Sequence, residues 1–196
     1  MAEQKLNKIF LSASIPTLDR DRKFYDTADI IAIRDAVRAL ATIAIPKAEL
    51  IWGGHPAITP LIRYVIQQMN ADVKKHVTLY QSLFFEAVFP PDNFDFENIE
   101  LIPKREDLLS SLDDMRHAMI GNNDFKVGIF IGGMEGIRTE YELFKFYHPE
   151  ALVLPVASTG AAAKLLYQDI QPAPPLALLQ NYAYMDLFQG LLKDYL

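Results

Sequence analysis

The residues best suited to chemistry lie in the segment 130–142, where an apolar run gives way to glycines and then to carboxylates. Its glycines are Gly132, Gly133 and Gly136. Glycine lets a backbone approach a ligand closely, and a helix that begins here directs its free N–H groups and positive dipole end at an anion. Glu140 follows within about one turn and is placed to contact a sugar. We therefore interpret the segment as a phosphate-and-sugar site, which a nucleotide fits.

The charged side chains of this segment each have an alternative role. Glu135 and Glu140 open the expected helix, where the macrodipole alone favours acidic residues. Arg138 lies in the same turn and can either reach a phosphate or pair with a glutamate. The sequence leaves both roles open for each of these residues.

Three further turns place small or polar residues where strands are expected to end. They are Ser12-Ala13-Ser14, Gly53-Gly54-His55 and Ser158-Thr159-Gly160. Such residues can serve turn geometry alone, and His55 is either a turn residue or a ligand contact. Together with Gly132 and Gly133, the turns can surround one ligand with hydroxyls, backbone donors and helix N-termini. The sequence has no Gly-x-Ser-x-Gly elbow and no P-loop lysine, which argues against both of those chemistries.

Strands and helices that alternate along the chain must position these residues. Short apolar runs predict six strands, over 8–12, 49–53, 77–80, 99–102, 126–131 and 151–155. Apolar residues at helical spacing predict helices over 28–44, 59–69, 105–120, 138–147 and 160–170. The alternation predicts an α/β fold, Rossmann-like with three αβα layers and a mostly parallel sheet of about six strands. Ligands of such folds bind at the carboxyl ends of the strands, where all four turns are expected.

Three segments depart from this alternation. Residues 13–27 form a long polar stretch that can act as a lid over the site. The Phe-rich segment 81–98 either packs irregularly over a sheet edge or contributes to a subunit contact. Residues 175–196 predict a terminal helix, which either docks on its own domain or forms a dimer contact.

Composition narrows the class of protein. With 196 residues, 51% of them hydrophobic, the chain suits a single globular domain over 1–196. A net charge of −6 argues against nucleic acid or an anionic membrane as a partner. The absence of cysteine excludes disulfides and Cys-zinc sites, and the scattered histidines predict no metal site. No apolar run is long enough for a leader peptide or a membrane span, so a cytoplasmic protein is expected.

The order of the Ser12, Gly53 and Gly132 motifs resembles the SLOG superfamily. This group of Rossmann-like domains joins LOG-type phosphoribohydrolases, DprA-like and TRPM-type domains, and nucleotide-sensing modules of bacterial immune systems. The resemblance covers residues 6–170. The positions that match the LOG-type pattern Pro-Gly-Gly-x-Gly-Thr-x-x-Glu are Gly132, Gly133, Gly136, after one extra residue, and Glu140. Ile131 replaces the proline of that pattern, and Ile137 replaces its threonine.

The resemblance implies that the chain binds or senses a nucleotide, a nucleotide sugar or an NAD-derived ligand, in bacterial stress or anti-phage signalling. The alternative is N-glycoside hydrolysis or ribosyl transfer. In that case Glu140 would stabilise positive charge at the anomeric carbon, while Arg138 helps to hold the 5′-phosphate. Neither role requires a cofactor. The expected partners are the small molecule and further copies of the chain in a homo-oligomer.

Overall fold

One sheet organises the computed structural model, which describes residues 6–196. Residues 1–5 belong to the N-terminal segment expected to contain no leader, and they lie outside the described residues. The six strands are β1 (Lys8–Ser14), β2 (Glu49–Trp52), β3 (Val77–Ser82), β4 (Asn98–Ile102), β5 (Phe125–Gly132) and β6 (Leu152–Val156).

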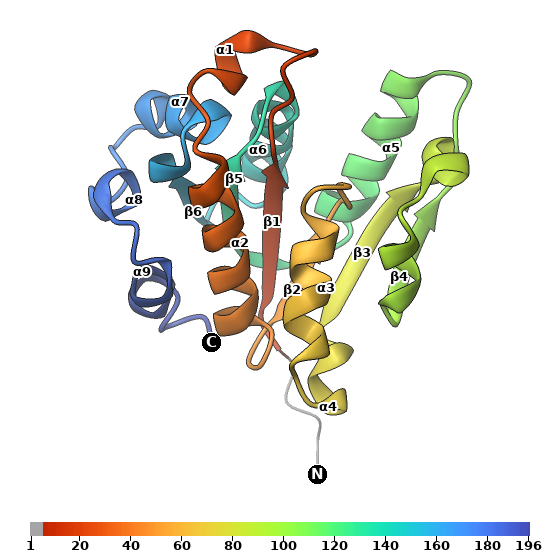
Figure 1. Ribbon diagram of the computed structural model, residues 1–196, viewed down its shortest axis with the longest axis horizontal. Helices are drawn as coiled ribbons and strands as arrows, with labels where there is room; N and C mark the ends of the chain where they lie inside the picture. The colour runs from red at the N-terminus through yellow and green to blue at the C-terminus, as the bar shows by residue number, and fades with distance from the viewer. Residues whose placement is uncertain (1–5) are drawn as a thin grey trace.

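The strands are all parallel and lie in the order β4-β3-β2-β1-β5-β6 (Figure 1). From β1 the chain builds outward through β2 and β3 to β4, then returns to the other side of β1 with β5 and β6. The direction of winding therefore reverses between β1 and β5. That reversal is the point at which open α/β sheets bind ligands, outside the carboxyl ends of the strands.

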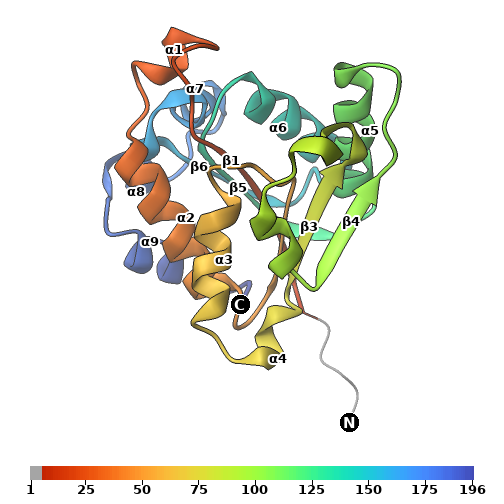
Figure 2. The same cartoon turned by 45° about the vertical axis from the view of Figure 1, so that its right-hand side comes forward.

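Helices cover both faces of the sheet (Figures 1 and 2). The first face carries α2 (Ile30–Ala44), α3 (Thr59–Gln67) and α9 (Tyr184–Leu191). The second face carries α5 (Leu108–Gly121), α6 (Glu135–Tyr147) and α7 (Ala161–Asp169). Shorter elements are α1 (Arg22–Tyr25), α4 (Ala71–Lys74), α8 (Ala177–Gln180), η1 (Leu83–Val88), η2 (Pro91–Asp95) and η3 (Ala157–Thr159). The Rossmann-like three-layer fold is thus confirmed.

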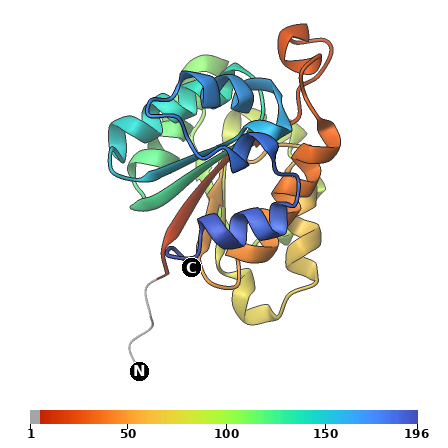
Figure 3. The ribbon, with the colours of Figure 1, turned by 90° about the vertical axis from the view of Figure 1, so that its left-hand side faces the viewer.

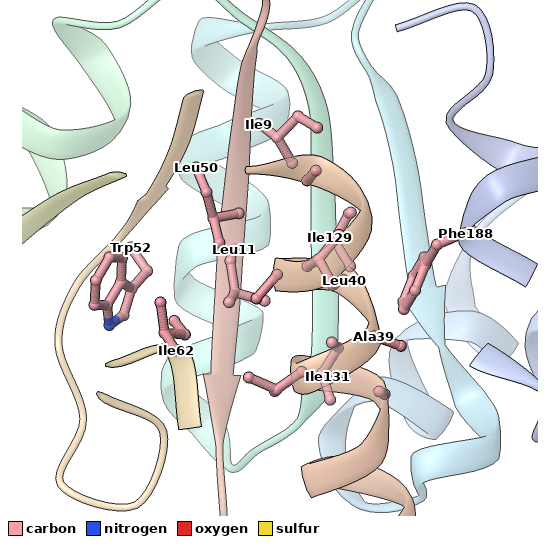
Figure 4. Close-up of a cluster of buried hydrophobic side chains, with 14 of the residues drawn as sticks. Ile9, Leu11, Ala39, Leu40, Leu50, Trp52, Ile62, Ile129, Ile131 and Phe188 are labelled. Carbon is pink, nitrogen blue, oxygen red and sulfur yellow. The ribbon is translucent and has the colours of Figure 1, made fainter. Parts of the chain in front are cut away.

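The core of the first face is built by α2 on the central strands (Figure 4). Asp29 caps the helix by accepting a hydrogen bond from the backbone N–H of Ala32 at 2.9 Å. Leu40 is fully buried against this face, to which β1 contributes Ile9 and Leu11. Each such side chain stabilises the fold by roughly 1.5–3 kcal/mol, so this face anchors the carboxyl ends of β1 and β5.

Aromatic rings fill the second face. Phe10 of β1 stacks on Phe144 of α6 with ring centroids 5.5 Å apart. Gly128 of β5 makes room for that ring, because a Cβ built there would lie 2.8 Å from Phe144. The resulting close packing of α6 on β5 fixes where the first turn of α6 meets the end of the sheet.

The terminal segment forms two helices, and the expectation of one helix over 175–196 is corrected. The break follows α8, where Asn181 Oδ1 accepts a hydrogen bond from the Ala183 N–H at 2.8 Å. Such a local side-chain bond competes with the continuing helix and turns the chain. The second piece, α9, then packs along α2 (Figure 3). Its Phe188 is completely buried.

Candidate functional site

The carboxyl ends of β1 and β5 lie side by side at the reversal of the sheet. Ser12 pairs in register with Phe130, and Ser14 pairs with Gly132. Because side chains alternate along a strand, Ser12 and Ser14 follow Phe10 onto the second face. The two predicted motifs therefore meet at one edge.

Gly132 and Gly133 make the turn that leads from β5 into α6. Their φ angles are +60° and +77°, in the left-handed region that glycine adopts without strain. The N–H of Gly133 donates to the Ser14 carbonyl at 2.8 Å, and that of Gly132 donates to Thr159 Oγ1 at 2.9 Å. Both glycine donors are thus used inside the protein. The first turn of α6, starting after Met134, has no side-chain cap. The N–H of Ile137 donates to the Met134 carbonyl at 3.0 Å, so the N–H groups of Glu135 and Gly136 are the ones open to an anion.

Glu140 of α6 is held by two side chains from other elements. Ser12 Oγ donates to Glu140 Oε2 at 2.5 Å, and Arg116 Nε of α5 donates to Glu140 Oε1 at 3.3 Å. The Arg116 and Glu140 side chains are only 16% and 17% exposed. Each carboxylate oxygen is therefore oriented, while the group keeps a path to solvent.

Arg116 was not among the residues predicted from the sequence. It occupies an otherwise apolar row of α5, between Leu112 and Ile120 at spacings of four. A lone arginine in such a row is the signal that could have identified it. Gly136 lies beneath its guanidinium, since a Cβ on Gly136 would come within 3.0 Å of Arg116 Nη2. The third glycine of the motif thus gives Arg116 its place beside Glu140.

Arg138 and Glu135 are not brought to this carboxylate. Arg138 Nη2 donates to Asp169 Oδ2 of α7 at 2.8 Å, and the arginine side chain is 41% exposed. Glu135 is exposed in the first turn of α6. The predicted catalytic role of Arg138 would require it to leave Asp169.

The turn Ser158-Thr159-Gly160 uses its hydroxyls within the fold. Ser158 Oγ lies 3.0 Å from the Tyr184 hydroxyl of α9, whose pKa is raised to about 12, chiefly by burial. Thr159 Oγ1 donates to the Val156 carbonyl at 2.5 Å besides accepting from Gly132. Ser158 and Thr159 therefore hold the glycine turn of β5 and helix α9 in place and offer no free hydroxyl to a ligand.

The N-terminus of α7 is closed by carbonyl groups of the protein. The N–H of Ala161 donates to Thr27 O at 3.3 Å, and that of Ala162 donates to Gly133 O at 3.2 Å. Gly160 precedes them with φ +72°, and a Cβ there would lie 1.9 Å from Thr27 O. This turn therefore joins the segment before α2 to the glycine turn of β5.

His55 lies in the turn between β2 and α3. Its Nδ1 accepts the N–H of Ala57 at 3.1 Å, and its own N–H donates to Thr59 Oγ1 at 3.2 Å. Burial, with the positive charge of Arg20, lowers the pKa of His55 to about 4. The ring is consequently neutral at pH 7, with its proton on Nε2, and can act there as a hydrogen-bond donor.

The pKa of His55 predicts how stability depends on pH. The unfolded chain takes up a proton near pH 6.5 and the folded protein only near pH 4, so stability is full above pH 6.5 and falls between these values. The loss over that range is on the order of 2–3 kcal/mol. Urea unfolding of the wild type and of His55→Gln at pH 7, 6 and 5 measures it. The variant should lose less stability than the wild type over this range, and equal losses would contradict the assignment.

Gly53 and Gly54 have different neighbours. A Cβ on Gly53 would meet the methyl groups of Met115 and Met119 at 3.2 Å, so α5 packs directly on this turn. A Cβ on Gly54 would lie 1.8 Å from Gln81 Nε2 of β3. Both glycines therefore allow close packing at the carboxyl end of β2.

Two kinds of feature are absent from residues 6–196. No group of three or more His, Asp or Glu side chains is arranged to hold a metal ion. None of the helices in this range combines the length and apolar character needed to cross a bilayer.

Comparison with known proteins gives one match that covers most of the chain. The sequence model described as the SLOG cluster3 family matches residues 23–192. A search of curated proteins finds no match. The matched range includes β2 to β6 and therefore Glu140, Arg116 and the glycine turn.

Proposed function

Because the chain belongs to the SLOG cluster3 family, we propose that it binds a nucleotide, a nucleotide sugar or an NAD-derived molecule at the carboxyl edge of its sheet. In this proposal the protein is a sensor of that ligand, in bacterial stress or anti-phage signalling. Family membership supports a nucleotide-related role. The residues at the carboxyl edge of the sheet support the position of the binding site.

The observation that carries the proposal is the position of Glu140. A carboxylate held between Ser12 Oγ and Arg116, at the reversal of the sheet, can accept hydrogen bonds from ribose hydroxyls. The uncapped first turn of α6 lies one to two turns before it in the same helix and can receive a phosphate. A sugar and a phosphate that are joined to each other match this pair of features.

Other groups of the edge complete the proposed site. Ser14 Oγ lies near the glycine turn, 3.3 Å from the position of a Cβ on Gly133. His55 can contribute its Nε2–H, since Nδ1 is already bonded to Ala57. Both groups are uncharged hydrogen-bond donors. They suit the uncharged parts of a ligand whose phosphate lies at the first turn of α6.

Titration calorimetry tests the proposal directly. The panel contains ADP-ribose, cyclic ADP-ribose isomers and the nucleoside monophosphates, with inorganic phosphate as the control for anion binding alone. We expect at least one nucleotide to bind more tightly than phosphate. Failure of every compound to bind at millimolar concentration would overturn the proposal.

N-glycoside hydrolysis is the second candidate, and Glu140 again favours it. An oriented carboxylate beside the anomeric carbon would stabilise the positive charge that develops as the glycosidic bond breaks. Incubation of the wild type with nucleotides and NAD, followed by chromatography, would reveal free base. Binding without release of base would favour the sensor over the enzyme.

The expected homo-oligomer stays a prediction. The first face offers a groove of about 600 Å³ between α2, α3 and α9, with exposed Tyr64, Tyr182 and Met185 along it. Light scattering of the ligand-free protein measures the assembly independently of the binding experiment.

A further inference from the structure

Buried polar groups without partners gather at the carboxyl ends of β2 and β3. Within residues 6–196, the fully buried side-chain polar atoms that lack a hydrogen bond are Trp52 Nε1 and both amide atoms of Asn93. Each of these residues is 2% exposed. Gln81 is 7% exposed, and its amide, which has no protein partner within residues 6–196, keeps some contact with solvent. Native proteins rarely leave such groups unpaired, so this place needs an explanation.

These three side chains lie on the first face of the sheet. Trp52 ends β2, and its indole nitrogen is on the side of the ring toward the carboxyl ends of the strands (Figure 4). Phe96 packs edge-on against the indole, with ring centroids 5.1 Å apart. Asn93 is the third residue of the 3₁₀-helix η2, and Phe96 caps its end three residues later, which puts both on one side of η2. Gln81 Nε2 fills the space left by Gly54, two residues after Trp52.

The chemistry of these groups matches the edge of a heteroaromatic base. The indole offers one donor, and each carboxamide offers an acceptor beside a donor. Asn and Gln bind adenine in this bidentate way, and any ring edge with a donor next to an acceptor fits the same pattern. A single buried water makes two to four hydrogen bonds, about half of what these groups offer.

We infer that Trp52, Gln81 and Asn93 form a subsite for the hydrogen-bonding edge of the base of the ligand. The inference rests on the proposed function, in which Glu140 and α6 hold the sugar and the phosphate. Strands β1 and β3 are two strand spacings apart, about 10 Å. Glu140 lies on the second face of the sheet and the subsite on the first, so a ligand that reaches both must pass over the carboxyl edge, where Gly53 and Gly54 carry no side chain. The base would then lie on the first face, across this edge from the sugar at Glu140.

Residues 83–97 form a cover over Trp52, on which their Phe96 packs. The cover is fixed to α3 by Arg63, which pairs with Asp92 at 2.9 Å and with Asp95. Its outer surface exposes Val88 and Phe94, at 71% and 76%. Entry of a base requires the cover to move. Its ion pairs with Arg63 are partly exposed and contribute little, so the main contact that must open is that of buried Phe96 with Trp52.

Trp52 is the sole tryptophan of the chain, so its fluorescence reports on this place alone. The probes are AMP, CMP, GMP and UMP, with purine riboside 5′-monophosphate as the comparison, because its ring lacks exocyclic groups. The best natural nucleotide should bind at least tenfold tighter than the comparison compound and should shift the Trp52 emission. Gln81→Leu and Asn93→Leu should each reduce that ratio toward one, whereas Gln67→Leu, at an exposed amide of α3, should preserve it.

Thermal unfolding separates recognition from simple structural support. Asn93→Leu should unfold at a temperature no lower than the wild type, because no hydrogen bond is lost. A marked loss of stability would show that the amide is already paired and would overturn the subsite. Equal affinity for the comparison compound, or an unchanged Trp52 emission at saturation, would overturn the subsite and leave the proposed function standing. Absence of all nucleotide binding would overturn both.

Discussion

Glu140→Gln should weaken binding of the tightest nucleotide of the panel by about 10- to 100-fold, measured by titration calorimetry. The substitution keeps the shape of the side chain but removes the negative charge that accepts from Ser12 and Arg116. A hydrogen bond to a charged group is worth about 1.5–3 kcal/mol, and about 1.4 kcal/mol corresponds to tenfold in affinity. The partly buried Arg116 also loses its counter-charge, so its orientation at the site is lost with it.

Glu142→Gln is the matched control for this experiment. It makes the same chemical change two residues later, on the exposed side of α6. Its affinity should stay within about twofold of the wild type, since surface charges contribute little. Unfolding curves of both variants check that the fold persists. If the protein also releases base, Glu140→Gln should abolish the release. Unchanged affinity in Glu140→Gln would place the ligand elsewhere.

Gly160→Ala should lower the free energy of unfolding by at least about 3 kcal/mol, measured by urea denaturation. At φ +72° and ψ −155°, Gly160 occupies a region that is essentially restricted to glycine. The added methyl would also lie 1.9 Å from the Thr27 carbonyl oxygen. This oxygen belongs to the backbone and accepts from Ala161, so it cannot yield as a side chain could. The backbone strain of alanine at these angles and the steric overlap with Thr27 therefore both lower the free energy of unfolding.

Gly190→Ala provides the opposite expectation within the same protein. Gly190 is exposed in α9, and nothing lies within 4 Å of a Cβ built there. Alanine is the better helix former, so this variant should be stabilised by up to about 1 kcal/mol. Similar destabilisation of both variants would mean that the conformation of Gly160 has been assigned wrongly.

The strands and helices could be predicted because apolar runs and turn residues mark them locally. The run at 126–131, for example, corresponds to β5, Phe125–Gly132, with one added residue at each end. The two helices of the C-terminal segment were missed, because the bond from Ala183 to Asn181 competes with a sequence that otherwise has helical spacing. The order of strands in the sheet depends on long-range packing, which local patterns do not encode.

The candidate site could be predicted in part for the same reason. Glu140 follows its glycines at a fixed spacing, so the sequence identifies it. Arg116 lies 24 residues earlier, and only the packing of α5 against α6 brings it to the carboxylate. Arg138 is adjacent in sequence, yet the helix turns it toward Asp169. The indole N–H of Trp52 has no hydrogen-bond partner because the segments packed around it supply no acceptor. Such an absence cannot be predicted from the residues next to Trp52 in the sequence.

The turn between β6 and α7 has a consequence for the motions of the site. Amide groups from distant segments, those of Gly132 and Asp29, both donate to Thr159, and Ser158 adds the contact to Tyr184 of α9. Neither amide can open to solvent while this turn is closed. Their hydrogens are therefore expected to exchange as one cooperative unit, so that the glycine turn, the entry to α2 and the C-terminal helix share a single opening equilibrium.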